Sequence, residues 1–465
     1  MREPLPGPPQ GRLDADPASP PDGGEAPPPP PAFSEDKPVK LEIAKTFSEE
    51  DLDVEAVKVV RRFMEAGYEA YLVGGCVRDL LFGLRPKDFD VVTSAQPAEI
   101  RKLFRNCRII GRRFRLAHVF FRDKIIEVAT FRAAATATVE GSEGKEAPGE
   151  LLIREDNVYG DAEEDARRRD FTVNALFYDV ARHVIIDHVG GVADAERKLI
   201  RTIGDAGIRM QEDPIRMLRA VRLASRLGCR LDEQTQEATR RYAPDILRAA
   251  TPRIHEDLLR MFSGGAMAPA FDMLLELGVM EVLLPELTAH LRRAEEGGQV
   301  EELEALRGCL RVADSWTQSG RQLSPAVRFA LLLAPVLLTP LEDAGSRDAG
   351  ALLNTALQPI SQRLSISRKE GERIRQVLLA LGRFVSRHKK RRFSVSAFIR
   401  RAYFGDALDL FELMTRATGD LREDAKRWRE RYVEAFPDGP PKPKKRSPRR
   451  RRHGREHGEK GARTG

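Results

Sequence analysis

"LVGGCVRDLLFGLRPKDFDVVT", residues 72–93, is the stretch that decides the fold of this chain. It predicts a strand ending in a glycine pair, a short helix that ends at Gly83, and a second strand over "DFDVVT". Gly74 and Gly75 would let the backbone approach a ligand closely, although most glycine pairs are only turns. The stretch therefore predicts a mixed α/β unit with a candidate binding site where strand meets helix.

Two aspartates, Asp88 and Asp90, are separated by a single residue in the second predicted strand. Residues two apart in a strand share a face, so the two carboxylates would lie roughly 7 Å apart. Like charges this close raise one another's pKa unless a cation lies between them. Carboxylates favour a hard cation such as Mg²⁺ or Mn²⁺. Taken alone, the pair fits the polar outer face of an edge strand equally well.

Glu127 adds a third carboxylate in "KIIEVATF", a predicted strand whose other residues are mostly apolar. A buried carboxylate without a partner is costly, so we expect Glu127 beside the aspartate pair. Three carboxylates around paired metal ions suit in-line phosphoryl transfer. Arg78 and Asp79, early in the helix after the glycines, are further candidates for a triphosphate site. GxxxxGK[ST] is absent, which excludes a P-loop enzyme.

Three segments occur in order: "LVGGCVRDLLFGLRPKDFDVVT", "RRRDFTVNALFYD" and "EDPIRMLRAVRLASRLG". Together they resemble the signatures of the class II nucleotidyltransferase superfamily, which contains bacterial poly(A) polymerases and CCA-adding tRNA nucleotidyltransferases. The resemblance covers about residues 37–260. It implies that Asp88 and Asp90 bind the catalytic metals, with Glu127 as the third acidic residue of the sheet.

The second segment holds three positions that the resemblance assigns to the ribose and phosphates of the incoming nucleotide. They are Arg169, Asp170 and Asn174. The resemblance also places Asp170 among the catalytic residues. A simpler interpretation, in which Asp170 caps a helix that begins at Phe171, is compatible with both roles.

The third segment predicts a base-recognition pair. Asp213 fits a helix N-cap with Pro214 at the next position, which puts Arg216 in the first turn near the Asp213 carboxylate. One acceptor beside a fork of donors matches adenine and cytosine, whereas guanine and uracil reverse the pattern. The pair therefore selects ATP and CTP without separating them; the alternative is an ion pair within one helix. Arg219 and Arg222 continue a basic stripe that could meet phosphates.

A basic segment, "LFRNCRIIGRRFRLAHVFF" at residues 103–121, resembles the matching part of bacterial poly(A) polymerases more than that of CCA-adding enzymes. No histidine immediately precedes an aspartate, as it would in the phosphohydrolase domain of some CCA-adding enzymes. We expect the segment to hold a primer backbone. Its arginines are Arg105, Arg108, Arg112, Arg113 and Arg115.

These features favour a poly(A) polymerase that transfers adenylates from ATP to RNA 3′ ends with Mg²⁺ or Mn²⁺. One alternative is a CCA-adding or A-adding tRNA nucleotidyltransferase. Another is an inactive RNA-binding homologue, against which the intact acidic residues speak. RNA-degradation factors are further candidate partners, but no residue pattern in the sequence points to them.

Length and periodicity divide the 465 residues into five parts. The predicted fold is an α/β nucleotidyltransferase head with a mixed sheet, followed by an all-α neck and body, with disordered N- and C-terminal tails. The parts are a Pro/Gly-rich tail (1–37), the catalytic head (38–180), a neck with base recognition (181–262), an RNA-binding body (263–436) and a basic arm (437–465). A mobile loop is expected between Ala133 and Asn157.

The net charge of +7 is concentrated in the basic arm. Residues 439–465 hold eleven Lys or Arg against two Glu, a net +9 that leaves about −2 on the rest of the chain. Such an arm neutralises phosphates without reading sequence, unless it serves only as a solubilising tail. The predicted RNA contacts are Lys444, Lys445, Arg446, Arg449, Arg450, Arg451 and Arg452.

The four cysteines show no CxxC spacing, which argues against a zinc site or a disulfide framework and favours reduced thiols in the cytoplasm. Cys76 stands where such polymerases often have a third glycine. The longest apolar run, Phe329 to Leu338, is too short to span a bilayer and is broken by Pro335. We therefore expect a soluble protein with no membrane partner.

Overall fold

A computed structural model describes most of the chain. The described residues are 40–111, 115–133, 158–299, 301–344, 348–385, 394–437 and 439. The predictions made for the two tails, for nearly all of the 133–157 loop, and for Arg112 and Arg113 lie outside these residues.

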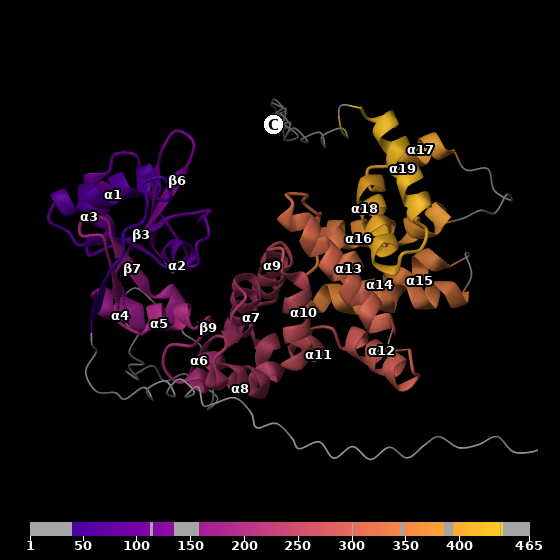
Figure 1. Cartoon of the computed structure of the whole chain (residues 1–465), viewed down its shortest axis with the longest axis horizontal. Coiled ribbons are helices and arrows are strands. Elements are labelled where there is room, and N and C mark those ends of the chain that lie inside the picture. Colours follow the sequence, from indigo (N-terminus) through magenta and orange to yellow (C-terminus); the bar gives the residue numbers. More distant parts are fainter. Residues whose placement is uncertain are drawn as a thin grey trace, which may run out of the picture. The chain divides into compact units, whose positions relative to one another are not determined.

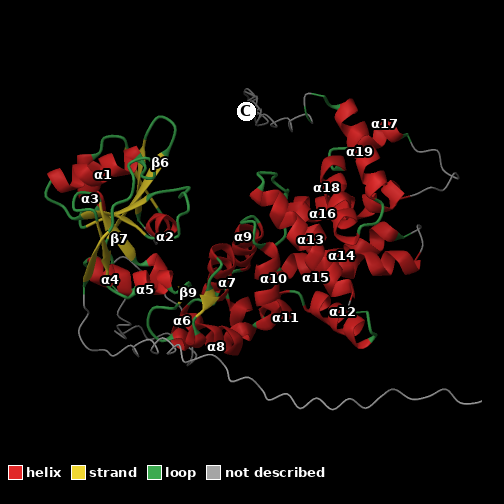
Figure 2. Ribbon diagram, in the orientation of Figure 1, coloured by secondary structure: helices red, strands yellow, loops and turns green. Residues whose placement is uncertain are grey.

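A mixed eight-stranded sheet forms the first part, as predicted (Figures 1 and 2). Its strand order is β1-β8-β7-β2-β3-β6-β5-β4, and only β3 and β6 pair in parallel. The strands are β1 (Leu41–Ala44), β2 (Ala70–Val73), β3 (Asp90–Thr93), β4 (Cys107–Ile110), β5 (Leu116–Phe120), β6 (Ile125–Thr130), β7 (Leu176–Asp179) and β8 (Val184–Asp187).

Helices cover both faces of this sheet because its buried residues alternate with a period of two. Leu72 and Val91 face one hydrophobic cluster with α1 (Val54–Glu65), α2 (Gly75–Leu81) and α3 (Pro97–Leu103). Val73 and Val92 face a second cluster that includes Ala166 of α4 (Ala162–Arg167). By the same alternation, Asp90 belongs to the face of Val92, and Glu127 shares that face because Ile126 and Val128 contribute to the first cluster.

The neck that follows is helical apart from a parallel pair of two-residue strands. Near its start, α6 and α7 succeed one another with only Asp213 and Pro214 between them. Its elements are α5 (Gly191–Glu196), β9 (Leu199–Ile200), α6 (Ala206–Glu212), α7 (Ile215–Leu227), β10 (Arg230–Leu231), α8 (Glu233–Tyr242) and α9 (Thr251–Phe262).

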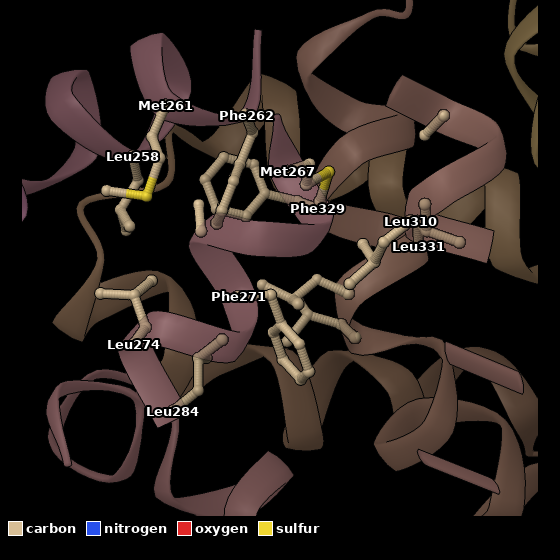
Figure 3. Close-up of a cluster of buried hydrophobic side chains, with 14 of the residues drawn as sticks. Leu258, Met261, Phe262, Met267, Phe271, Leu274, Leu284, Leu310, Phe329 and Leu331 are labelled. Carbon is tan, nitrogen blue, oxygen red and sulfur yellow. The ribbon is translucent and has the colours of Figure 1, made fainter. Parts of the chain in front are cut away.

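Ten further helices form the described body, which Figure 2 shows in red without strands. One hydrophobic cluster runs from the neck into this body, and Figure 3 shows Phe262 of α9 near Phe329 of α14, with ring centroids 6.2 Å apart. The helices are α10 (Met267–Glu276), α11 (Val279–Leu283), α12 (Pro285–Glu296), α13 (Glu301–Gln318), α14 (Pro325–Ala344), α15 (Ala349–Arg363), α16 (Arg368–Val385), α17 (Val395–Ile399), α18 (Phe404–Thr418) and α19 (Arg422–Ala435).

Several local expectations were wrong. The sheet extends to Asp187, beyond the expected head boundary at residue 180, because β8 pairs with both β1 and β7. The sequence pattern did not predict β1 and β4, two strands at the edges of the sheet. Helix α14 continues through Pro335, which does not break it. None of the described helices is long and apolar enough to cross a membrane.

Candidate active site

A pocket of about 360 Å³ gathers most of the predicted nucleotide-binding residues. Four places in the chain contribute to it: the β2–α2 turn, the start of β3, the segment after α4, and the α6–α7 junction with α7. The lining residues are Gly74, Gly75, Arg78, Asp90, Arg168, Arg169, Asp170, Asn174, Asp213, Arg216, Arg219, Arg222 and Leu223. Segments more than 100 residues apart in sequence thus form one largely polar site.

Gly74 makes the turn at which β2 ends and α2 begins. Its φ of +75° lies where residues with a side chain are strained, and its amide donates to the carbonyl of Leu176 on the neighbouring strand β7. A Cβ at this position would lie 3.1 Å from Nη1 of Arg169. Glycine therefore allows both the turn and the close approach of a guanidinium to the backbone.

Two arginines of the pocket are fixed by buried carboxylates. Arg169 donates from Nε and Nη2 to Asp165 at 3.0 and 2.8 Å, and Arg78 donates from Nε and Nη2 to Asp79 at 2.9 and 2.6 Å. Arg78 also donates to the side-chain oxygen of Asn174 at 2.5 Å. Asp79 does not line the pocket, so the structure places it behind Arg78.

Asp79 also connects α2 to the neck. Its second oxygen accepts a hydrogen bond from Arg226 of α7 at 2.7 Å. Arg209 of α6 makes a similar connection, since its guanidinium donates to the carbonyls of Arg168 and Arg169. These contacts hold α6 and α7 against the elements that present the glycine turn.

Asp170 is buried and fully engaged. Its carboxylate accepts from the amide of Phe171 at 2.9 Å and from Nδ2 of Asn174 at 3.0 Å, and it pairs with Arg219 at 2.7 Å. Burial opposes ionisation, but Arg219 and these hydrogen bonds hold the pKa of Asp170 below its usual range. The expected helix from Phe171 is wrong: a single 3₁₀ turn, Thr172–Asn174, follows.

Asp90 is the first residue of β3, and Glu127 lies beside it on β6, because Val91 is in register with Val128. Protein atoms surround Asp90 closely although the residue is open to solvent. Burial, followed by the charge of Glu127, raises the pKa of Asp90 to about 6; Arg169 opposes this and Asp88 adds to it. The three predicted metal ligands are therefore electrostatically coupled.

Two premises of the metal prediction were wrong. Asp88 precedes β3 and does not belong to the strand. The Glu127 side chain is 52% exposed, so burial does not demand a partner for it, and its Oε1 lies 3.4 Å from Nε2 of His118. Neither residue lines the pocket.

The charges of Asp88, Asp90 and Glu127 suit a divalent cation, but their side chains do not converge on one point. No group of three His, Cys, Asp or Glu side chains in the described part of the chain is close enough to hold a metal. Burial is the main cause of the raised pKa of Asp90, and the charges of Glu127 and Asp88 add to it; a cation would relieve that repulsion. These residues stay a predicted metal site.

The base-recognition pair lines the pocket with contacts that differ from the prediction. Helix α7 begins at Ile215, and Asp213 ends α6 instead of capping α7. The expected side-chain pair of Asp213 and Arg216 is replaced by a backbone bond, from the amide of Arg216 to the carbonyl of Asp213 at 3.0 Å. The Arg216 guanidinium instead donates to Glu212 at 2.9 Å and to the carbonyl of Arg209 at 2.7 Å.

The Asp213 carboxylate is bound by an arginine that the sequence pattern did not single out. Arg253, in the first turn of α9, donates to its two oxygens at 2.9 and 2.8 Å. Arg222 similarly faces Asp257 of α9 at 3.3 Å, and burial lowers the pKa of Arg222. Because these partners lie about 40 residues apart, local spacing carried no signal for them.

Arg168 and Leu223 complete the lining and were also missed. Arg168 adjoins Arg169 in "RRRD", so the cluster of arginines was a usable signal. Leu223 supplies an apolar wall, and a leucine in an amphipathic helix is indistinguishable from a core residue by periodicity alone.

The described arginines of the basic segment are exposed. Arg108 lies on β4, the edge strand, and Arg105 and Arg115 flank β4 and β5. Since β6 and β5 separate β3 from β4, this edge lies about 14 Å from β3. A chain several nucleotides long could contact both places.

Comparisons with known proteins identify the family of this chain. A family model described as the Poly A polymerase head domain matches residues 70–201, and one described as the probable RNA and SrmB-binding site of polymerase A matches residues 228–291. Poly(A) polymerase I of Escherichia coli O6:H1 is 37% identical over 400 residues, which cover 84% of this chain and 85% of that protein.

CCA-adding enzymes are also similar. That of Geobacillus kaustophilus is 36% identical over 238 residues, which cover 51% of this chain and 56% of its own. The crystal structure of the Bacillus stearothermophilus CCA-adding enzyme in complex with CTP matches with a TM-score of 0.59 at 25% identity, over 83% of this chain and 82% of that one.

Proposed function

This chain belongs to the class II nucleotidyltransferases, in the family of the bacterial poly(A) polymerases, and we propose that it adds adenylates from ATP to RNA 3′ ends without a template, releasing pyrophosphate. The pocket carries this proposal, because it joins an arginine-lined, glycine-turn end to a base-reading end. The sequence similarity to the Escherichia coli poly(A) polymerase extends over most of the chain, whereas that to the Geobacillus kaustophilus CCA-adding enzyme extends over about half.

The phosphate end of the pocket is the β2–α2 turn. Gly74 and Gly75 let the guanidinium groups of Arg169 and Arg78 come close to the backbone, and Asp165 and Asp79 hold these groups in place. A preorganised arginine fork matches phosphate oxygens and stabilises the charge that develops on pyrophosphate.

Enzymes of this family use divalent metal ions, and we propose Mg²⁺ or Mn²⁺ held by Asp88, Asp90 and Glu127. The bound metal would lower the pKa of the attacking 3′ hydroxyl and neutralise the triphosphate. Asp170 is committed to Arg219 and Asn174, so we assign it as a positioning residue for the groups around the ribose and phosphates.

The RNA partner is a 3′ end whose backbone contacts Arg105, Arg108 and Arg115 and the basic arm. We also propose a cytoplasmic location, because all four cysteines are free thiols. RNA-degradation factors are a further class of proposed partners.

Incubating the protein with Mg²⁺, a generic RNA and each labelled nucleoside triphosphate separately tests the function. We expect tails made of adenylate alone. Incorporation of CTP on tRNA that ends at its discriminator base would favour CCA addition instead. No incorporation from any triphosphate would favour an RNA-binding homologue without activity.

A further inference from the structure

The part of the sheet beside the predicted metal ligands has one open face. The first hydrophobic cluster takes Val119 from β5 and Val128 from β6. The alternate residues of these strands lie on the other face, and among the described residues the second cluster takes none from β4 or β5. This open face is on the same side of the sheet as Asp90.

Two rows of side chains cross the open face. In the first row, Arg108 of β4 is opposite His118 of β5, and His118 is opposite Glu127 of β6. In the second row, Phe120 of β5 is opposite Ile125 of β6. The two rows lie about 7 Å apart along the strands. Cationic, aromatic, aliphatic and acidic side chains thus share one surface.

Phe120 and Ile125 form an apolar patch on this surface. Their exposed fractions are 41% and 47%, and because they are cross-strand neighbours the exposed area is continuous. The ring of Phe120 meets the ring of His118 edge to face, with centroids 6.3 Å apart. Exposed apolar side chains scattered singly are ordinary, whereas a contiguous patch beside charged residues marks a contact surface.

The hairpin that carries the patch is held in place at its turn. Lys124, between β5 and β6, forms ion pairs with Asp53 and Glu55 at the start of α1. The side-chain amide of Asn106 donates to the carbonyl of Phe120. A surface that is already ordered loses little freedom when a ligand binds, so the entropic cost of binding is smaller.

Single-stranded RNA suits this surface. An exposed ring stacks on any base, because every base has a π-face, and stacking reads no sequence. Strand β5 lies about 10 Å from β3, since only β6 separates them, and stacked nucleotides rise about 3.4 Å each. The exposed arginines that follow the same edge can meet the phosphates of such a strand; they are Arg105, Arg108 and Arg115.

We infer that Phe120, supported by Ile125, stacks on a base of the RNA primer about two to four nucleotides from its 3′ end. The inference rests on the proposed function and deepens it, because the arginines account only for contacts to the RNA backbone. Stacking holds the strand across the open face and directs its end toward Asp90. Phe120 is thus a positioning residue for the primer.

The test measures RNA affinity, and KM for RNA in adenylate addition, with primers that carry one abasic site at successive positions from the 3′ end. In wild-type protein we expect an abasic site at one of the positions about two to four from the end to weaken binding about 10-fold. Phe120→Ala should weaken binding of the intact primer by a similar factor. The same abasic site should then cost this variant nothing further, because the two changes remove one contact.

Three further variants serve as controls. Phe120→Trp keeps a π-face and should retain the affinity of the wild type. Phe120→Leu keeps an apolar side chain without a ring and should lose affinity as Phe120→Ala does. Leu41→Ala is the matched surface control, because Leu41 is 47% exposed on β1, at the opposite edge of the sheet, and its loss should change neither affinity nor KM.

Unchanged affinity in Phe120→Ala, or losses that add when Phe120→Ala meets an abasic primer, would overturn the inference. A lower melting temperature with unchanged RNA affinity would also overturn it, since part of the protein itself would then pack on Phe120. A wild-type protein that adds no adenylate to any primer would overturn the proposed function. The abasic effect on affinity would then decide the stacking contact by itself, so the two failures are distinguishable.

Discussion

At the scale of single residues, the carboxylates of the candidate site lie in different environments. Asp170 is buried yet keeps a low pKa, because Arg219 and two hydrogen bonds stabilise its charge. Asp90 is open to solvent yet has a raised pKa, because burial of its surroundings and the charge of Glu127 disfavour ionisation. Asp170 is already paired with Arg219, whereas Asp90 remains a predicted ligand of a cation.

Replacing a predicted metal ligand separates catalysis from binding. We expect Asp88→Ala to lower adenylate incorporation about 1,000-fold or more, because several kcal/mol of transition-state stabilisation would be lost. RNA affinity, measured by filter binding, should remain. Full activity in this variant would remove the metal assignment.

The raised pKa of Asp90 predicts a pH-dependent effect on stability. The folded protein binds this proton more tightly than the unfolded chain, whose aspartate titrates near 4. The stability contributed by this group therefore falls as pH rises from about 4 to the folded value of about 6, and is constant above it.

Asp90→Asn removes the repulsion, so its melting temperature in EDTA should exceed that of the wild type by more at pH 8 than at pH 5. Asp123→Asn, in the exposed turn between β5 and β6, is a control in which the difference should not depend on pH. An Asp90→Asn difference that is equal at both pH values would contradict the raised pKa.

At the scale of elements, the β2–α2 turn forms the end of the pocket that we propose for the phosphates. Strand β2 is bonded on both sides, to β3 and to β7, so the turn leaves the middle of the sheet. The positive φ of Gly74 directs the chain from β2 into α2 while leaving space for Arg169. Backbone conformation and side-chain placement are thus coupled at one residue.

We expect Gly74→Ala to cost about 1–3 kcal/mol of stability through backbone strain and to lower activity by displacing Arg169. Denaturant unfolding followed by an ATP incorporation assay measures both. Gly75→Ala is the stability control, since its added Cβ would make only an ordinary 3.6 Å contact with Arg78. It should unfold within about 1 kcal/mol of wild type. Equal destabilisation by Gly74→Ala and Gly75→Ala would show that backbone strain at residue 74 is not the cause.

At the scale of the whole molecule, charge is separated from the catalytic fold. The net +9 of residues 439–465 exceeds the +7 of the entire chain. Charge of this density attracts RNA through counterion release and carries no sequence information. Such an arm would add affinity for many RNA 3′ ends without altering which nucleotide the pocket selects.

Deleting residues 439–465 should weaken RNA binding most at low salt. The logarithm of RNA affinity falls linearly with the logarithm of salt concentration, and for single strands each neutralised phosphate adds about 0.7 to the steepness of that line. The line for the truncated protein should therefore be shallower. The ATP to CTP preference should not change. If affinity at low salt were the same with and without the arm, the arm would be only a solubilising tail.

Local sequence was sufficient for the features that depend on neighbouring residues. The strand, glycine turn, helix and second strand of residues 72–93 were predictable, because alternation and the conformational freedom of glycine act within a few positions. The strand that carries Glu127 was predictable for the same reason, and it is confirmed as β6. Edge strand β1 was missed because it pairs with β8, which lies far away in the sequence. Edge strand β4 was missed although it pairs with the next strand, β5.

Sequence by itself determined the family, the acidic residues at β3 and two residues of the pocket, Asp213 and Arg216, that we predict to read the base. Only the tertiary structure decided their partners: Arg253 for Asp213, Glu212 for Arg216, and Arg226 for Asp79. The physical reason is that a guanidinium selects among all carboxylates that packing brings within reach. That choice depends on how α7 lies against α9 and α2, which no local pattern encodes.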